Sequence, residues 1–388
     1  MNFELTETQQ SIRASIARIC TRFDDEYWRL KDTTGDFPFE FVSALAEDGW
    51  LGICMPEAYG GSGLGIADAA VMMRAISEGG GGMSAASAMH VNVFGLNPVV
   101  VFGTEQQKRR HLPAVIRGEV RACFAITEPN TGLNTTQLKT QAVRRGDHYA
   151  VNGSKVWIST AQVAHKVLLL ARTTPLEDVR RPTEGLTLFY TDLDRSAVEV
   201  REIDKMGRKC VDSNELFIVD WKVPAEDRIG DEGRGFEYVL HGMNPERILI
   251  AAEAVGLGHL ALSRATRYAN DRVVFNRPIG SNQGIQHPLA ENWMELEAAW
   301  LMTMLAAWEY DSGKNCGATA NSAKYLAGEA GFNACQRAVM THGGYGYAKE
   351  YNVERYLREI MVPRIAPISP ELIKCYIAEK VLGLPKSY

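Results

Sequence analysis

The middle third of this sequence is patterned differently from its two ends, and this change constrains the fold more than any other feature. Between about residues 121 and 230, short runs rich in β-branched and aromatic residues recur at roughly even spacing, with turn residues between them. One run is HYAVNGSKVWIS (148–159), in which Asn152-Gly153 is a hairpin signal. No G-x-G-x-x-G segment follows a strand, and strands do not alternate with helices. We therefore predict a compact antiparallel β barrel or sandwich and not a doubly wound sheet.

Helical patterns flank this β region on both sides. The N-terminal part carries apolar residues three and four apart, as in TETQQSIRASIARIC. In the C-terminal part, Asn244-Pro245 is typical of an N-cap followed by proline, and the segment behind it is apolar on nearly all sides. Two more long helices are expected at about 284–312 and 318–342. The predicted class is α+β, with an N-terminal helical domain (1–120), a middle β domain (121–230) and a C-terminal four-helix bundle (231–388).

Composition and charge exclude several classes of protein. The 388 residues are 46% hydrophobic with a net charge of −5, which supports a large core and offers no basic surface for nucleic acid. No stretch approaches the roughly 20 apolar residues of a membrane span. The seven cysteines are scattered without a C-x-x-C pair, so we predict neither disulfides nor a metal site. The N-terminus is typical of an amphipathic helix and not of a signal peptide, and we expect a cytoplasmic protein.

Several segments, in order along the chain, resemble the acyl-CoA dehydrogenase family. FAITEPNTGLNT (124–135) resembles its flavin-binding signature, KVWIS (155–159) follows at the family's spacing, and DRVVFNRPIGSNQGIQH (271–287) resembles its arm to a neighbouring subunit's flavin. THGGYGYAKEYNVER (341–355) resembles its glycine-paired loop. The resemblance runs from about residue 5 to 388, and this collinearity carries it. It implies an FAD enzyme that forms a homotetramer as a dimer of dimers.

The resemblance also assigns residues to the cofactor. Backbone groups and a threonine hydroxyl at a strand end can hydrogen-bond the edge of the flavin ring, and an arginine on the arm can meet the anionic pyrophosphate. The implied cofactor-binding positions are Phe124, Ile126, Thr127, Trp157, Ser159, Arg272, Phe275, Gln283, Gly343, Gly344, Ser369 and Glu371.

The catalytic base departs from the commonest family pattern. The family's reaction removes an α-proton from an acyl thioester while the β-hydride leaves to the flavin N5. In most members the base is the Glu of a Tyr-Glu-Gly-Thr segment, but here RIAPISPELIK (364–374) places Pro367 at that position. Isovaleryl-type and long-chain-type members carry the Glu on a bundle helix, which matches Glu246. The resemblance thus implies Glu246 as the base, with Glu371 as a rival carboxylate.

The expected substrate contacts leave two functions open. Arg247 resembles the arginine that borders the CoA channel, Asn244 lies on the same helix end, and Leu133 replaces a serine that bonds CoA-side atoms. The leading hypothesis is an acyl-CoA dehydrogenase of fatty acid metabolism that passes electrons to an electron-transfer flavoprotein. The alternative is a flavin-dependent oxidase or monooxygenase on a non-CoA substrate. The length and shape of the acyl group stay open.

Overall fold

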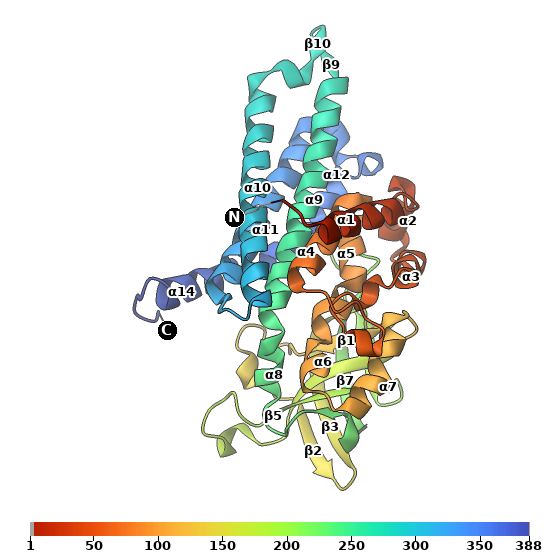
Figure 1. The fold of residues 1–388 in the computed structure, drawn as a ribbon, viewed down its shortest axis with the longest axis vertical. Helices are drawn as coiled ribbons and strands as arrows, with labels where there is room; N and C mark the ends of the chain where they lie inside the picture. Colours follow the sequence, from red (N-terminus) through yellow and green to blue (C-terminus); the bar gives the residue numbers. More distant parts are fainter. Residues whose placement is uncertain (1–3, 388) are drawn as a thin grey trace.

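The fold was analysed in a computed structural model that describes residues 4–387. Figure 1 shows a long helical bundle, with the first helices against its side and the sheet at one end. The N-terminal helices are α1 (Glu7–Cys20), α2 (Asp25–Thr34), α3 (Phe39–Glu47), α4 (Ile66–Ile76), α5 (Gly82–His90), α6 (Asn97–Phe102) and α7 (Glu105–Ile116). The strands that follow are β1 (Ala122–Ala125), β2 (Gln141–Arg145), β3 (His148–Ser159), β4 (Lys166–Arg172), β5 (Leu186–Asp192), β6 (Val198–Glu202), β7 (Ser213–Pro224) and β8 (Arg228–Ile229). The C-terminal elements are α8 (Gly235–His241), α9 (Met243–Asp271), β9 (Val273–Val274), β10 (Arg277–Pro278), α10 (Gln283–Asp311), α11 (Gly317–His342), α12 (Val353–Glu359), α13 (Met361–Ile365) and α14 (Pro370–Lys380).

The β region confirms the prediction of a middle sheet domain. In the described part of the chain, eight strands form one sheet in the order β6-β7-β3-β2-β4-β5-β8, with β1 beside β4. Most pairs are antiparallel, but β1 and β2 pair with β4 in parallel, which the sequence did not indicate. Both faces are covered: Leu169 and Phe189 enter one core, while Leu168 and Tyr190 enter the core shared with α6, α7 and α8. Burial on alternate sides explains why these strands are continuously apolar.

The predicted hairpin at Asn152-Gly153 is wrong. Strand β3 runs straight through both residues, and its register against β7 shifts between Val151 and Gly153, which marks a bulge. A Cβ at Gly153 would lie 2.5 Å from the Thr140 hydroxyl oxygen, so glycine serves close packing here and not a turn. The chain instead reverses between Arg145 and His148, at the end of β2.

The bundle is built on α9, whose side chains are buried nearly all round, as its sequence predicts. The helix begins at Met243 and not after an Asn244 N-cap, because Gly242 has helical backbone angles and links α8 directly to α9. Two helical segments, Ile66–Phe102 and Gly235–Asp271, are apolar and long enough to cross a bilayer, which differs from the sequence-based expectation. Their apolar windows are 67% and 83% buried inside the protein, as in core helices.

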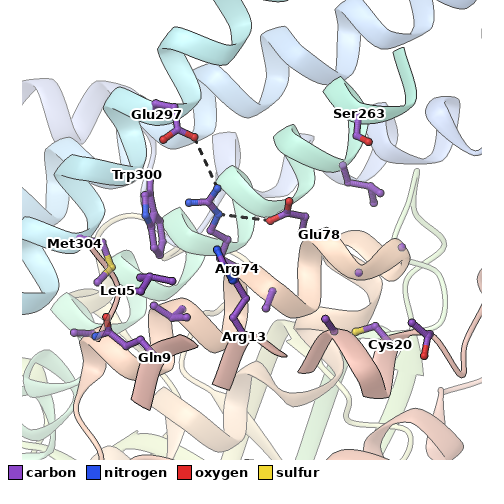
Figure 2. A pocket seen from close by; sticks show the side chains of 18 of the residues that line it. Leu5, Gln9, Arg13, Cys20, Arg74, Glu78, Ser263, Glu297, Trp300 and Met304 are labelled. Carbon is purple, nitrogen blue, oxygen red and sulfur yellow. Dashed lines mark ion pairs between the residues drawn. The ribbon is translucent and has the colours of Figure 1, made fainter. Parts of the chain in front are cut away.

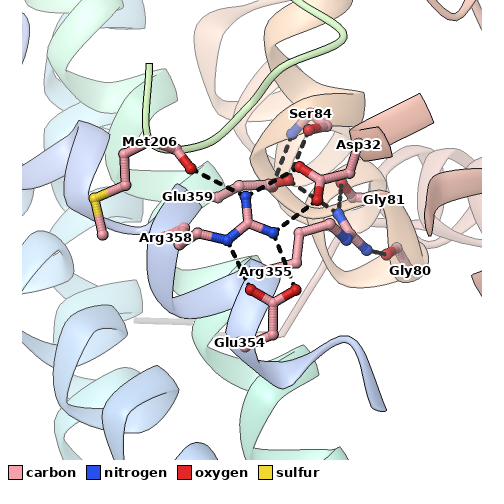
Figure 3. A network of polar contacts seen from close by, with 9 residues as sticks. All are labelled: Asp32, Gly80, Gly81, Ser84, Met206, Glu354, Arg355, Arg358 and Glu359. Atoms are coloured by element: carbon pink, nitrogen blue, oxygen red, sulfur yellow. Dashed lines mark hydrogen bonds and ion pairs between the residues drawn. The ribbon is translucent and has the colours of Figure 1, made fainter. Parts of the chain in front are cut away.

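A buried ion pair fixes the position of α5 against the C-terminal region (Figure 3). The Glu359 carboxylate accepts hydrogen bonds from the Ser84 backbone N–H at 3.0 Å, the Ser84 hydroxyl at 2.7 Å and Arg355 at 3.1 Å. Arg355 also donates to the backbone oxygens of Gly80 and Gly81. Since these bonds hold the start of α5, they also set where its last residue, His90, lies.

Candidate functional site

A histidine and two glutamates meet between α5 and α9. His90 ends α5, while Glu246 and Glu253 lie two turns apart on the same face of α9. The three residues are 8%, 7% and 0% exposed, respectively. Buried charges are stable only when they are paired, so this group is a strong candidate for function.

The imidazole of His90 bridges the two carboxylates. Its Nδ1 hydrogen-bonds Glu253 Oε1, and its Nε2 lies 3.5 Å from Glu246 Oε1. Burial alone would lower the pKa of His90, but the two carboxylates outweigh it and raise that pKa to about 10. The two carboxylates therefore favour the imidazolium form of His90. The second carboxylate oxygens, Oε2 of Glu246 and of Glu253, have no hydrogen-bond partner within residues 4–387.

The neighbours of Glu246 are cationic. Arg247 donates to Asn244 Oδ1 at 3.0 Å, and burial lowers the pKa of Arg247 although Glu246 opposes this. Lys324 of α11 is 1% exposed, and burial lowers its pKa to about 8 against the opposing effect of Glu246. The Glu246 carboxylate thus lies among three basic side chains, those of His90, Arg247 and Lys324.

The segment around Pro367, where the family resemblance would place a base, makes structural contacts. Lys324 Nζ donates to the backbone oxygen of Ile368 at 2.6 Å, next to Pro367. Ser369 is the N-cap of α14 and accepts from the Leu372 N–H at 3.3 Å. Glu371 lies exposed in the first turn of α14. Of the two carboxylates expected from sequence, only Glu246 is buried.

The predicted flavin-ring residues of the sheet gather at the ends of β1 and β3. The half-buried Phe124 packs against Phe94 of the N-terminal region, with ring centroids 5.4 Å apart. The backbone oxygens of Ile126 and Thr127 accept from Lys155 Nζ and the Val156 N–H, both at 2.9 Å. The hydroxyl of Thr127 makes no hydrogen bond within the described chain, so it is free for a ligand.

Trp157 and Ser159 form an exposed wall beside these strand ends. Trp157 is 59% exposed, and its φ of 61° is in the left-handed region that side chains rarely adopt. The strain accompanies a second bulge in β3, between Lys155 and Ile158. Ser159 Oγ accepts from Arg208 at 3.2 Å, which leaves its own proton available to a ligand. Strained backbone that exposes a large aromatic ring is typical of a binding site.

A second group of predicted cofactor residues lies at the other end of the bundle, around the β9–β10 hairpin (Figure 1). Arg272 lines a surface cavity of about 670 Å³ with Gly343 and Gly344, and its guanidinium lies 5.9 Å from the Tyr345 ring centroid. Phe275, at the hairpin tip, is 94% exposed. Gln283 begins α10 and is also exposed.

These two groups cannot serve one cofactor within a single chain. The stretch of α9 between Glu253 and Arg272 is about 28 Å long at roughly 1.5 Å per residue. The sheet group lies beyond the first end and the hairpin group beyond the second. A site that uses both groups therefore needs the hairpin end of another copy.

A large cavity of the described chain is lined by none of the predicted site residues. Its volume is about 1590 Å³, and it opens between α1, α4, α9 and α10. Figure 2 shows Arg74 at its centre, ion-paired to Glu78 at 3.6 Å and Glu297 at 3.9 Å and lying 4.5 Å from the Trp300 ring centroid. Because its central charge is already satisfied, we place the candidate active site at the α5–α9 cluster.

One expected substrate contact, Leu133, and four residues that were not expected from sequence have still to be placed. Leu133 is 64% exposed on a loop of the β region. Sequence reasoning missed His90, Glu253, Arg208 and Lys324. Glu253 carried a usable signal, because it follows Glu246 by seven residues on a buried helix.

Comparisons with known proteins cover the whole chain. Family models of the acyl-CoA dehydrogenase N-terminal, middle and C-terminal domains match residues 6–119, 123–221 and 233–380. The chain belongs to the acyl-CoA dehydrogenase family. It is therefore an oxidoreductase of an FAD-dependent family.

Three relatives illustrate the range of this acyl-CoA dehydrogenase fold. Acyl-CoA dehydrogenase FadE12 of Mycobacterium tuberculosis (strain ATCC 25618 / H37Rv) is 36% identical over 391 residues, covering 100% of this chain and 99% of its own. The structure of butyryl-CoA dehydrogenase from Megasphaera elsdenii has a TM-score of 0.93 at 29% identity, covering 98% of this chain and 100% of that one. The prolyl acyl carrier protein oxidase AnaB has a TM-score of 0.92 at 29% identity, with the same coverage.

The residues of this acyl-CoA dehydrogenase fit FAD. The exposed Trp157 face beside the hydroxyls of Thr127 and Ser159 suits a flat ring with polar edges. The arginine-lined cavity at Gly343 and Gly344, where an added Cβ at either glycine would meet nothing within 4 Å, suits a bulky anionic group.

Proposed function

We propose that this protein dehydrogenates an acyl-CoA thioester between its α and β carbons, with Glu246 as the base. The observation that carries the proposal is the state of the Glu246 carboxylate. It is 7% exposed, one oxygen faces the His90 imidazole at 3.5 Å, and the other has no partner in the described chain. A buried, ionised carboxylate with one free oxygen is what α-proton abstraction requires.

The other roles follow from the surroundings of Glu246. Glu246 takes the α-proton on its free Oε2, while burial between α5 and α9 keeps water from the reacting carbon. Bound FAD supplies the acceptor for the β-hydride. Trp157, Thr127 and Ser159 would hold its ring, with Phe124 and Ile126 behind them. Arg247 and Asn244 border the thioester end, and Leu133 offers an apolar surface there.

Anaerobic flavin bleaching tests this proposal. A panel of acyl-CoA thioesters is added without oxygen to wild type, Glu246→Gln and Glu371→Gln, each with its FAD content measured. We expect one thioester to bleach wild type and Glu371→Gln, and Glu246→Gln to stay oxidised with normal FAD content. Bleaching of Glu246→Gln at the wild-type rate would refute Glu246 as the base. No bleaching of wild type by any thioester would refute the dehydrogenase function.

The proposed electron acceptor is an electron-transfer flavoprotein. The alternative, a flavin oxidase or monooxygenase on a non-CoA substrate, is favoured by Leu133 in place of the CoA-bonding serine and by the similarity to AnaB, an oxidase for a prolyl acyl carrier protein. Reoxidation of the reduced enzyme separates the two. Fast reoxidation by an electron-transfer flavoprotein and slow reoxidation by oxygen supports the dehydrogenase, and the reverse order supports the alternative.

We further infer a homotetramer in which each FAD is shared between subunits. Two features support it: the separation of the two cofactor groups along α9, and an exposed apolar stripe on α10. The stripe consists of Met294, Leu301, Leu305 and Trp308, which are 56%, 50%, 42% and 52% exposed. In Phe275→Asp we expect lower FAD content and a smaller particle by light scattering. Val219→Asp, at a 68% exposed valine of the sheet, is the control that should change neither.

The proposed setting is the cytoplasm, with a role in fatty acid metabolism. All seven cysteines lie in the described chain and are free. Burial raises the pKa of Cys20, Cys54, Cys123 and Cys210 to about 12, which makes these thiols unreactive. Free thiols of this kind support a reducing compartment.

A further inference from the structure

Contacts besides the His90–Glu253 pair fasten α9 to the end of α4 and the start of α5 to α12. The Ser77 hydroxyl donates to the Glu253 backbone oxygen at 2.8 Å, and the Arg355–Glu359 pair holds the start of α5. A fully buried glutamate side chain paired to a buried histidine is expensive in a helical core. We therefore expect the His90–Glu253 pair to have a role in the chemistry of the neighbouring Glu246.

We propose that His90, held by Glu253, is a positioning residue that keeps the Glu246 carboxylate ionised and turns its free oxygen toward the substrate. The proposal rests on Glu246 being the base. It deepens the proposed function by assigning two residues to the same site.

The contacts of His90 support this role. Nδ1 is occupied by Glu253, which orients the ring and leaves Nε2 pointing at Glu246 Oε1. Phe94 packs on the ring at 4.6 Å between centroids and limits its rotation. Nε2 faces Oε1 of Glu246 at 3.5 Å without a hydrogen bond, and Oε2 has no hydrogen-bond partner in the described chain, so Oε2 is the oxygen more open to a proton from the substrate.

The His90–Glu253 pair also affects the charge of Glu246. Without the imidazolium, Glu246 and Glu253 would be two negative charges in one buried space, and one of them would take a proton. The imidazolium makes the His90–Glu253 pair neutral, so Glu246 keeps its charge without a second anion beside it. The pKa of His90, raised to about 10, agrees with this state.

The other charged groups around the cluster come from one loop and three helices. Arg208, on the loop after β6, interacts with Glu253. Lys324 of α11 and Arg247 of α9 interact with Glu246. In α12, Arg355 and Glu359 are paired to each other. The cations favour an ionised Glu246, but among them only the His90 ring lies within 4 Å of its oxygens.

The experiment compares His90→Gln and Glu253→Gln with wild type in anaerobic bleaching from pH 5 to 9. The control is His259→Gln, at a partly buried histidine of α9 that lies outside the cluster. We expect His90→Gln to slow bleaching at saturating thioester and to move the acid limb of the rate upward by about one pH unit or more. One unit is a tenfold change in the ionised fraction. Glu253→Gln removes an anion and the partner that orients the His90 ring, so it should slow bleaching without moving the acid limb upward. His259→Gln should change neither the rate nor the acid limb, and the KM should change little in all three variants.

A second measurement covers the case in which His90→Gln does not fold. Infrared difference spectra of wild type against Glu246→Gln, at pH 6 without substrate, report a protonated carboxyl group at Glu246. The proposal expects no such band in wild type.

The outcomes separate the two proposals. If Glu246→Gln bleaches normally, the base assignment fails and the positioning role fails with it. If Glu246→Gln is inactive while His90→Gln keeps the wild-type rate and acid limb, only the positioning role is overturned. A protonated Glu246 in wild type at pH 6 would also overturn it.

Discussion

Arg208 donates to the Ser159 hydroxyl at 3.2 Å and, from its other terminal nitrogen, to the Ser87 hydroxyl at 3.0 Å. One guanidinium therefore links the sheet wall that we propose for the flavin to helix α5, which carries His90. Arg208 has a φ of 55°, so the backbone is also strained to bring its side chain to this place.

We predict that Arg208→Met lowers FAD affinity roughly tenfold, because the Ser159 hydroxyl loses the donor that orients its own proton outward. Ser159→Ala should have a similar effect, and Ser87→Ala a much smaller one. In the variant that combines Arg208→Met with Ser159→Ala, the two losses of FAD affinity should not add, since both changes act through the Ser159 hydroxyl. Equilibrium binding of FAD to the apoprotein measures all four, and additive losses would contradict the shared mechanism.

Glu359→Ala tests the pair that positions α5. The change leaves the Arg355 cation buried without its carboxylate partner and removes both bonds to Ser84. We expect a loss of about 3–5 kcal/mol in the free energy of unfolding. Urea unfolding at fixed protein and FAD concentrations measures it. Glu184→Ala, which removes an exposed partner of Arg181, is the control and should leave the midpoint unchanged.

Regular elements were predictable from sequence where local pattern decides them. The run at 148–159 coincides with β3, and the helices expected at 284–312 and 318–342 correspond to α10 and α11. Periodicity and β-branched content suffice for such segments, because each element buries its own apolar face. The hairpin at Asn152-Gly153 failed because its glycine serves contact with Thr140, a tertiary feature that local pattern does not contain.

The candidate site was predictable only in part. Glu246 followed from the absence of a carboxylate at Pro367 and from the family resemblance. His90 did not, because a single histidine in the apolar stretch AASAMHVNVF looks like a core residue. The role of His90 becomes visible only when α5 packs on α9, because this packing brings His90 within hydrogen-bonding distance of Glu253, 163 residues away in the chain.

Gly256→Ala should weaken the packing of α9 on α4. An added Cβ would lie 2.4 Å from the Arg74 backbone oxygen and 3.0 Å from Ser77 Cβ, so the two helices must move apart. Overpacking of this kind costs about 1–3 kcal/mol of stability. Gly284→Ala is the matched control, since its Cβ would meet nothing within 4 Å in the first turn of α10. A lower urea midpoint for Gly256→Ala alone is expected, and equal midpoints would contradict the close approach.

His111 gives the protein an acid-sensitive element in the core shared by the helices and the sheet. The residue is 3% exposed, its ring meets Tyr190 edge-on at 4.9 Å, and its Nε2 has no partner within residues 4–387. Burial, with smaller effects of Lys166 and Arg110, lowers its pKa from 6.5 to about 4. As the pH falls from 6.5 to about 4, the unfolded chain binds a proton at His111 and the folded chain does not, so stability falls.

We therefore expect His111→Phe, which keeps a ring against Tyr190, to lose less stability than wild type as the pH falls from 6.5 to 4. Urea midpoints at matched protein and FAD concentrations measure the two slopes, with the partly exposed His148→Gln as control. The control should follow wild type, because its histidine already reaches solvent in the folded state. If the urea midpoints of wild type and His111→Phe fell equally with pH, His111 would have to take up a proton in the folded protein. That result would contradict the effect expected from its burial.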